Sequence, residues 1–221
     1  MKILVTGGAG FIGSHIVEIL VNHGHEVFVL DNMSTGKKIN VHPKATLCIA
    51  DITDPGIENI FEKEKFDAVC HQAATTNVSK SIADPITNAH TNIMGTLNLL
   101  EMSKKHGVKK FIFASTGGAL YGNAKVFPTP EDYPAKPISP YGIGKLTGEQ
   151  YLYYYSIIHG LRVIVLRYSN VYGPRQDRNG EGGVVAIFIK QLLVPEQTQP
   201  VINGTGEQTR DFIFVGDIAL A

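Results

Sequence analysis

The 221-residue sequence contains no tryptophan, only two cysteines and no excess of charge of either sign. Lysine and arginine together number 20, as do aspartate and glutamate, so the formal net charge at pH 7 is zero. A chain without a basic surplus has no general means of holding a nucleic-acid backbone or an anionic membrane surface. We therefore expect neither a nucleic acid nor a membrane among its partners.

Long hydrophobic runs are also missing. No apolar stretch approaches the roughly 20 residues that a membrane helix needs, and the N-terminus leads into a strand and a glycine-rich turn rather than a signal peptide. Cys48 and Cys70 each lie inside an apolar run, which is typical of small core residues and not of a disulfide framework or a metal cage. The sequence thus predicts a cytoplasmic protein without a metal site.

What the sequence does contain is an alternation of short β-branched runs with longer helical patterns. This alternation indicates a doubly wound parallel sheet covered by helices on both faces. The predicted strands are Lys2–Thr6, Glu26–Leu30, Thr46–Ala50, Phe66–His71, Lys109–Ser115 and Arg162–Tyr168. The predicted helices run from the glycine turn to about Gly24 and over Pro55–Lys65, Ser81–His106, Pro140–His159 and Val184–Leu193. From Gly173 the alternation loosens, which predicts a second and smaller layer.

The strongest local pattern is TGGAGFIGSH, residues 6–15, which follows the first strand and opens the first helix. Gly7, Gly10 and Gly13 allow a tight turn, the approach of a pyrophosphate and close packing of helix on strand. The helix N-terminus then faces the phosphates. Asp31 follows about 20 residues later, where its carboxylate can accept hydrogen bonds from the adenosine ribose and repel a 2′-phosphate. The pattern favours NAD over NADP.

A second group of residues indicates proton transfer. Tyr141 and Lys145 are four residues apart on a predicted helix and so lie on one face of it. An ammonium near a phenol favours the phenolate, which is a general base usable near neutral pH. Ser115 and Thr116 end the preceding strand, and in such a sheet the carboxyl ends of the strands line the ligand crevice.

These motifs together resemble the extended short-chain dehydrogenase/reductase family, and the resemblance spans essentially the whole chain. It rests on the glycine motif, Asp31-Asn32, Asp51-Ile52, HQAA (71–74), NIMGT (92–96), Ser115-Thr116, Tyr141/Lys145 and RYSNVYGPR (167–175). The likeness is greatest to the nucleotide-sugar 4-epimerases of that family. It implies a Rossmann-type fold, NAD as cofactor, and interconversion of UDP-glucose and UDP-galactose through a transient 4-keto sugar. Tyr141 would remove the proton of the 4-hydroxyl, and Lys145 would hold the ribose and keep the tyrosine acidic.

The resemblance also assigns binding residues by position. It implies that cofactor contacts come from Gly7, Gly10, Phe11, Ile12, Gly13, Asp31, Asn32, Met33, Ser34, Thr35, Gly36, Asp51, Ile52, Gln72, Ala73, Ala74, Thr76, Asn92, Ser115, Tyr141, Lys145 and Tyr168. Asp51 would meet the adenine edge. Asn170 and Arg210 would hold the diphosphate of the sugar nucleotide, while Thr116 and Tyr141 would contact the sugar.

Two positions depart from the family pattern. Gly117 stands where many relatives carry an active-site serine, so the hydroxyl role passes to Thr116, with Ser115 as the alternative. Thr76 stands where some relatives have a cofactor-contacting lysine. Between Thr116 and Tyr121 there is no carboxylate of the kind that family dehydratases and decarboxylases use, which favours epimerisation. The alternatives are another nucleotide-sugar enzyme, such as a uronate epimerase or a dehydratase, and an NAD-binding module without turnover.

The resemblance also implies a domain division and an assembly. Residues 1–170 would form the NAD-binding domain, and residues 171–221 would form part of a nucleotide-sugar-binding lobe that is shorter than in full family members. The long helix through Ile82–Leu100 and the tyrosine-rich helix after Pro140 have apolar side chains to spare. In the family these helices pair across a twofold axis, so we expect a homodimer.

Overall fold

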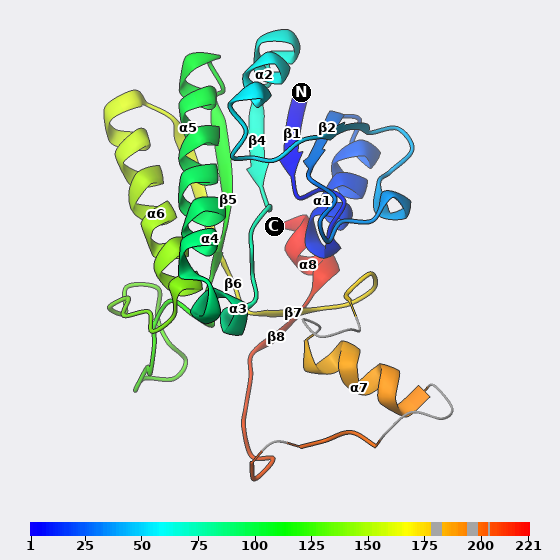
Figure 1. Ribbon diagram of the computed structural model, residues 1–221, viewed down its shortest axis with the longest axis vertical. Coiled ribbons are helices and arrows are strands. Elements are labelled where there is room, and N and C mark those ends of the chain that lie inside the picture. The colour runs from blue at the N-terminus through cyan, green and yellow to red at the C-terminus, as the bar shows by residue number, and fades with distance from the viewer. Residues whose placement is uncertain (178–182, 194–198, 203) are drawn as a thin grey trace.

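A six-stranded parallel sheet forms the centre of the computed structural model, which describes residues 1–177, 183–193, 199–202 and 204–221 (Figure 1). The strand order is β3-β2-β1-β4-β5-β6. The strands are β1 (Lys2–Thr6), β2 (Glu26–Asp31), β3 (Thr46–Ile49), β4 (Ala68–His71), β5 (Lys110–Thr116) and β6 (Arg162–Tyr168). The doubly wound parallel sheet predicted from the sequence is confirmed, and each predicted strand is found within two residues of its expected ends.

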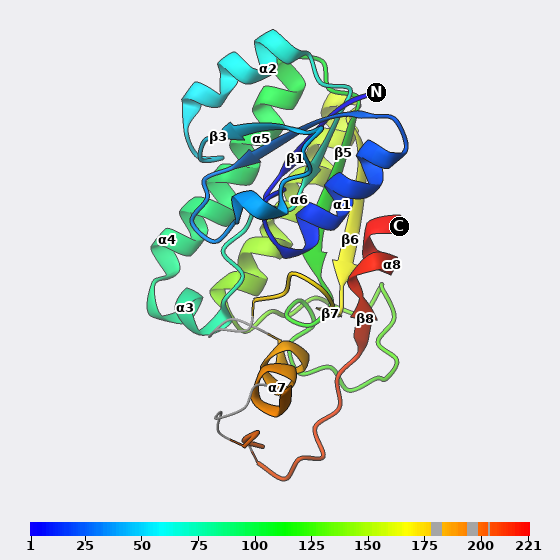
Figure 2. The ribbon, with the colours of Figure 1, turned by 90° about the vertical axis from the view of Figure 1, so that its right-hand side faces the viewer.

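Helices cover both faces of this sheet because successive side chains of each strand point to opposite sides. Leu4 packs in a core with residues of α5 (Gly95–Lys105) and α6 (Pro140–His159). Its neighbours Ile3 and Val5 pack in the opposite core against α1 (Phe11–Asn22). Figure 2 shows the sheet between these two helical layers.

Helix ends follow the expected capping chemistry. Asp54 accepts a hydrogen bond from Gly56 N and begins a 3₁₀ turn, Pro55–Ile57, that runs into α2 (Glu58–Glu64). Ser139 accepts one from Gly142 N and caps α6, with Pro140 at the first helical position. A further 3₁₀ turn spans Lys38–Asn40.

The predicted helix over Ser81–His106 is wrong as a single element. The structure has α3 (Val78–Ala83), α4 (Pro85–Ala89), a π-helical turn (His90–Met94) and then α5. Asp84 ends α3 with a non-helical backbone (φ −137°, ψ 80°), and its side chain caps α4 through Thr87 N at 3.0 Å. Pro85 explains the break, since a proline cannot donate the backbone hydrogen bond that a continuous helix requires.

A smaller layer follows β6. Strands β7 (Asn170–Tyr172) and β8 (Phe212–Phe214) pair in parallel, and α8 (Val215–Leu220) packs on α1. Helix α7 (Val184–Leu193) lies below this pair in Figure 1. Residues 178–182, 194–198 and 203 of this layer lie outside the described part of the chain. No helix among the described residues has the length and apolarity to span a membrane.

Candidate active site

The glycine turn at the carboxyl end of β1 leaves no room for side chains. A Cβ on Gly7, whose φ is +67°, would lie 2.7 Å from Ala73 N, and a Cβ on Gly13 would lie 2.2 Å from the Gly7 oxygen. Gly10 caps α1 without a side-chain hydrogen bond, so no side chain of the cap occupies the first amides of the helix. Bare backbone amides at the positive end of a helix fit the pyrophosphate of a dinucleotide.

Asp31 stands at the end of β2 next to this turn. The side chain is buried, and its Oδ2 accepts a hydrogen bond from Ala9 N at 3.0 Å while Oδ1 accepts one from Met33 N at 2.9 Å. The carboxylate is thereby fixed against the glycine turn, and each oxygen keeps a lone pair for a further donor. This placement fits the predicted contact with the ribose.

Asp51 lies across from Asn32, which donates from Nδ2 to Asp51 Oδ2 at 2.7 Å. Thr53 donates to the other oxygen from its backbone nitrogen at 2.9 Å and from its hydroxyl at 2.7 Å. Burial acts to raise the pKa of this carboxyl, but the hydrogen bonds outweigh burial and the pKa is lowered. Asp51 is therefore an ionised acceptor just beyond the carboxyl end of β3, where the sequence predicts a contact with the cofactor.

A buried histidine connects the strand ends behind the glycine turn. His71 lies between the hydroxyls of Thr6 (2.7 Å from Nδ1) and Thr96 (3.0 Å from Nε2). The Thr96 hydroxyl already donates to Asn92 O at 2.7 Å, so it accepts from His71 Nε2–H, and Nδ1 accepts from Thr6. Asn92 in turn bonds both the N–H and the C=O of Thr75. This network fixes the 71–76 segment, which the sequence predicts to line the dinucleotide.

Thr116, Tyr141 and Lys145 meet at the carboxyl end of β5. Helix α6 presents Tyr141 and Lys145 on one face, and the Thr116 hydroxyl is close enough to the Tyr141 phenol to lower its pKa. Lys145 is buried, donates from Nζ to Ala114 O at 2.7 Å and lies 4.8 Å from the centre of the Phe113 ring. The Ser115 hydroxyl instead donates to Glu149, two turns beyond Tyr141 on α6. The geometry thus favours Thr116 over Ser115 as the hydroxyl beside the tyrosine.

The electrostatics of this pair differ from the sequence-based expectation. Burial raises the pKa of Tyr141, and the hydrogen bond with Thr116 offsets part of that rise. Burial lowers the pKa of Lys145 to about 8. The expected lowering of the tyrosine pKa by Lys145 is absent in this arrangement, where the amine is bonded to a β5 carbonyl.

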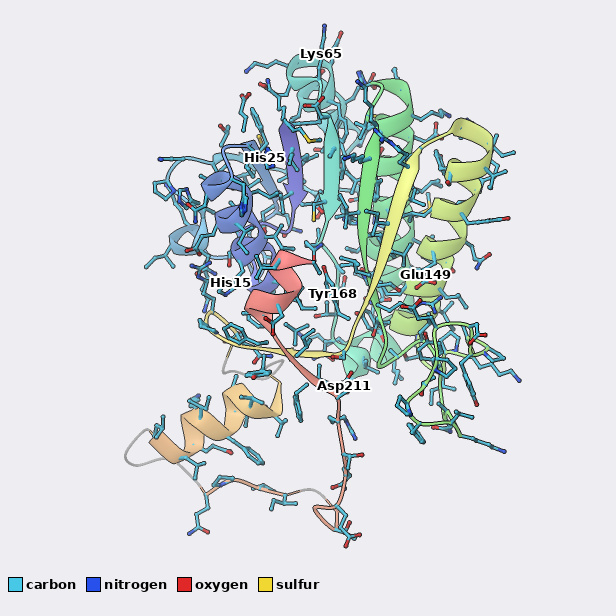
Figure 3. All side chains as sticks on the ribbon, turned by 180° about the vertical axis from the view of Figure 1, so that it is seen from behind. His15, His25, Lys65, Glu149, Tyr168 and Asp211 are labelled. Carbon is cyan, nitrogen blue, oxygen red and sulfur yellow. The ribbon has the colours of Figure 1, made fainter. Side chains whose placement is uncertain are left out.

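The two residues predicted to hold a diphosphate come together in the smaller layer. Asn170 begins β7 and donates from both its backbone and side-chain nitrogens to Asp211 O. Arg210 precedes Asp211 and is exposed, with Nη1 bonded to Thr209 O. Tyr168, labelled with Asp211 in Figure 3, ends β6 and donates to Gln72 Oε1 at 3.3 Å, which joins the carboxyl ends of β6 and β4 within the main sheet.

Sequence reasoning assigned no role to His71, Glu149 or Arg167. His71 and Arg167 stand inside the motifs that carry the family resemblance, and Glu149 follows Lys145 at the same spacing of four residues that separates Tyr141 from Lys145. That spacing, Tyr-x₃-Lys-x₃-Glu, was the signal available for Glu149. Among the described residues, no group of three or more His, Cys, Asp or Glu side chains is placed to hold a metal ion.

Comparison with known proteins identifies the family to which this fold and sequence are similar. Residues 3–221 match the model of the NAD dependent epimerase/dehydratase family. UDP-glucose 4-epimerase of Mycolicibacterium smegmatis is 42% identical over 223 residues, covering 99% of this chain and 71% of the relative. A crystal structure of Thermotoga maritima UDP-glucose 4-epimerase with UDP-glucose superposes with a TM-score of 0.96 at 51% identity, covering 100% of this chain and 71% of that one.

A second solved structure links the fold to the cofactor. UDP-glucose 4-epimerase of Thermus thermophilus in complex with NAD superposes with a TM-score of 0.93 at 46% identity and covers 100% of this chain and 72% of that one. The match extends through the glycine turn, the sheet and the smaller layer, which confirms the resemblance drawn from the motifs. The chain therefore belongs to the NAD dependent epimerase/dehydratase family.

Proposed function

We propose that the chain catalyses the NAD-dependent epimerisation of a nucleotide sugar at C4 and interconverts UDP-glucose and UDP-galactose. The observation that carries this proposal is the placement of Tyr141, Thr116 and Lys145 at the carboxyl edge of the sheet that also holds the glycine turn and Asp31. A base and a dinucleotide cradle then share one crevice.

The residues divide the work as follows in this proposal. When bound, NAD supplies the reversible oxidation of the sugar at C4 and a positive ring that favours the Tyr141 phenolate. The Tyr141 oxygen removes the proton of the 4-hydroxyl and later returns it, so the base is regenerated in each cycle. Thr116 donates a hydrogen bond that stabilises the phenolate and orients the sugar hydroxyl, and Lys145 anchors the cofactor ribose. Asn170 and Arg210 hold the diphosphate through an amide and a guanidinium.

The segment after Thr116 supports epimerisation over related reactions. Residues 117–121 are Gly-Gly-Ala-Leu-Tyr and carry no carboxylate to remove water or carbon dioxide from the sugar. The remaining candidates are a uronate epimerase and an NAD-binding module that does not turn over. The half-buried Tyr141, next to the buried Lys145 on α6, favours an enzyme over such a module.

A substrate panel tests the proposal. The chain with NAD is offered UDP-galactose, UDP-glucuronate and UDP-N-acetylglucosamine, and the 4-epimers formed are separated and quantified. We expect the highest kcat/KM for UDP-galactose. A preference for the uronate, or NAD binding without turnover of any of the three, would contradict it.

Assembly and setting complete the proposal. We infer a homodimer, because α6 presents the exposed apolar side chains Ile143, Tyr154 and Ile157 along one face. We place the reaction in the cytoplasm and in galactose metabolism, where UDP-hexoses are interconverted.

A further inference from the structure

A buried carboxylate lies directly behind the proposed catalytic residues. Glu149 follows Lys145 by one turn of α6 and Tyr141 by two turns, so all three lie on the same side of the helix. Its carboxylate accepts the Ser115 hydroxyl and is held by Arg167, whose Nε donates to Oε1 at 3.1 Å and whose Nη2 donates to Oε2 at 2.7 Å. Figure 3 marks Glu149 on α6 near the segment that joins β5 to this helix.

Arg167 also reaches into that segment, residues 117–138, which we call the β5–α6 loop. Its remaining terminal nitrogen, Nη1, donates to the Tyr121 hydroxyl at 2.8 Å and to Glu131 O at 2.6 Å. The guanidinium carbon lies 5.5 Å from the centre of the Tyr121 ring. One side chain on β6 therefore contacts α6 and two separate points of the loop. Lysine, with a single amine, cannot reproduce that arrangement.

The loop in turn fixes the hydroxyl beside the proposed base. Ala119, two residues before Tyr121, donates its backbone N–H to Thr116 Oγ1 at 3.2 Å. This bond uses one acceptor site of the hydroxyl and leaves its proton available for donation, and Tyr141 is the neighbour whose pKa this hydroxyl lowers. Ala119 O also lies against the first turn of α6, where a Cβ on Gly142 would come within 2.4 Å of it. The start of the loop thus packs between Thr116 and α6, the helix that carries Tyr141.

We propose that Arg167 is a positioning residue that holds the β5–α6 loop through Tyr121 and Glu131, and thereby orients the Thr116 hydroxyl toward Tyr141. Glu149 fixes the guanidinium and keeps Ser115 turned away from the site. The inference rests on the proposed function for its kinetic consequence, whereas its structural part is independent of turnover.

The first test measures amide hydrogen exchange by NMR in the unmodified chain and in two matched variants. Tyr121→Phe removes the hydroxyl that Arg167 contacts. Tyr133→Phe is the control, because Tyr133 lies in the same loop with its ring 6.1 Å from Tyr121 and its hydroxyl bonded to Lys125 N, not to Arg167. We expect exchange of the Ala119 amide to be about fivefold faster in Tyr121→Phe, as for loss of one hydrogen bond, and unchanged in the control. Unchanged Ala119 exchange in Tyr121→Phe would overturn the proposal.

The second test is kinetic. We expect Tyr121→Phe and Arg167→Lys to lower kcat for UDP-galactose by about fivefold or more. KM and NAD affinity should be unchanged, because only the orientation of the Thr116 hydroxyl beside Tyr141 is altered. A rise in KM at constant kcat would overturn the positioning role. If the unmodified chain fails to turn over, the proposed function fails, while the exchange measurement still decides whether Arg167 holds the loop and Thr116.

Discussion

His71 illustrates how one buried residue connects strand ends to a binding segment. Burial lowers its pKa to about 3, so the ring stays neutral and keeps Nε2–H as a donor and Nδ1 as an acceptor between two threonines. The sequence placed His71 in a family motif but could not indicate its tautomer, because that follows from the Thr96 bond to Asn92. The placement of Tyr141 beside Lys145 on α6 was easier to predict, because a spacing of four residues puts both side chains on one face of a helix.

The neutral His71 makes stability depend on pH. In the unfolded chain the ring titrates near 6.5, whereas the folded pKa is about 3, so below pH 6.5 the unfolded state binds a proton that the folded state does not. The free energy of unfolding should therefore fall as the pH drops from about 6.5 toward 3, by up to about 1.4 kcal/mol per unit. Urea denaturation at pH 7.5 and 5.0 measures this. His71→Gln, which does not titrate, should have a shallower dependence, and an equal slope in both proteins would contradict the assignment.

The close packing of the glycine turn predicts that a single added methyl group weakens NAD binding. Gly13→Ala places a Cβ 2.2 Å from Gly7 O, so the backbone must shift where the pyrophosphate is proposed to lie. We expect NAD affinity to fall at least tenfold, measured by calorimetry. Gly24→Ala is the control: its φ is +79° and nothing lies within 4 Å of a Cβ there, so it should cost about 1 kcal/mol of stability and leave NAD affinity unchanged. If Gly13→Ala bound NAD as tightly as the unmodified chain does, the glycine turn would not be part of the cofactor site.

Among the elements, strands and α6 were predictable and the segment before α5 was not. Buried parallel strands are nearly uniform in apolarity, and α6 has a Ser-Pro start and Gly160 after its end. The apolar periodicity over Ser81–His106 runs through Asp84-Pro85, so periodicity alone predicted one helix where the proline divides it. The π-helical turn depends on tertiary contacts, among them the Asn92 side chain bonded to Thr75, and no sequence period marks it.

The N-cap of α6 should matter because this helix carries Tyr141 in its first turn. Ser139→Ala removes the side-chain acceptor for Gly142 N and leaves a buried amide without its partner. We expect a loss of about 1 kcal/mol in the free energy of unfolding, measured by denaturant titration. Ser139→Thr, which retains a hydroxyl, should lose less. Indistinguishable stabilities of the alanine and threonine variants would show that the cap contributes nothing.

At the scale of the whole molecule, the sequence predicted a parallel sheet and a looser C-terminal layer, but not how the layers join. The parallel pair of β7 and β8 consists of two three-residue strands separated by 39 residues, which is too short and too distant a pairing for periodicity to indicate. Arg175, with φ of +68°, donates from Nη2 to Glu18 on α1 at 2.6 Å. These contacts are tertiary, so they follow only from the folded chain. The division at residue 170 stays a prediction.

The proposed homodimer can be tested on the exposed face of α6. Ile157 is 64% exposed on that face, and Ile157→Glu would place a charge in the proposed interface. We expect sedimentation to change from dimer to monomer. Ile39→Glu is the control, because Ile39 is 91% exposed on the 3₁₀ turn at Lys38–Asn40, away from α6. A monomer in the unmodified chain, or a dimer unaffected by Ile157→Glu, would contradict the assembly.

The central claim is that Tyr141 performs proton transfer in the epimerisation of a UDP-hexose. The most direct measurement is the rate of conversion of UDP-galactose to UDP-glucose with added NAD, in the unmodified chain and in Tyr141→Phe, with NAD affinity measured in both. The account predicts a loss of about 10²-fold or more in kcat for Tyr141→Phe with NAD affinity retained. Equal turnover in the two proteins would contradict it.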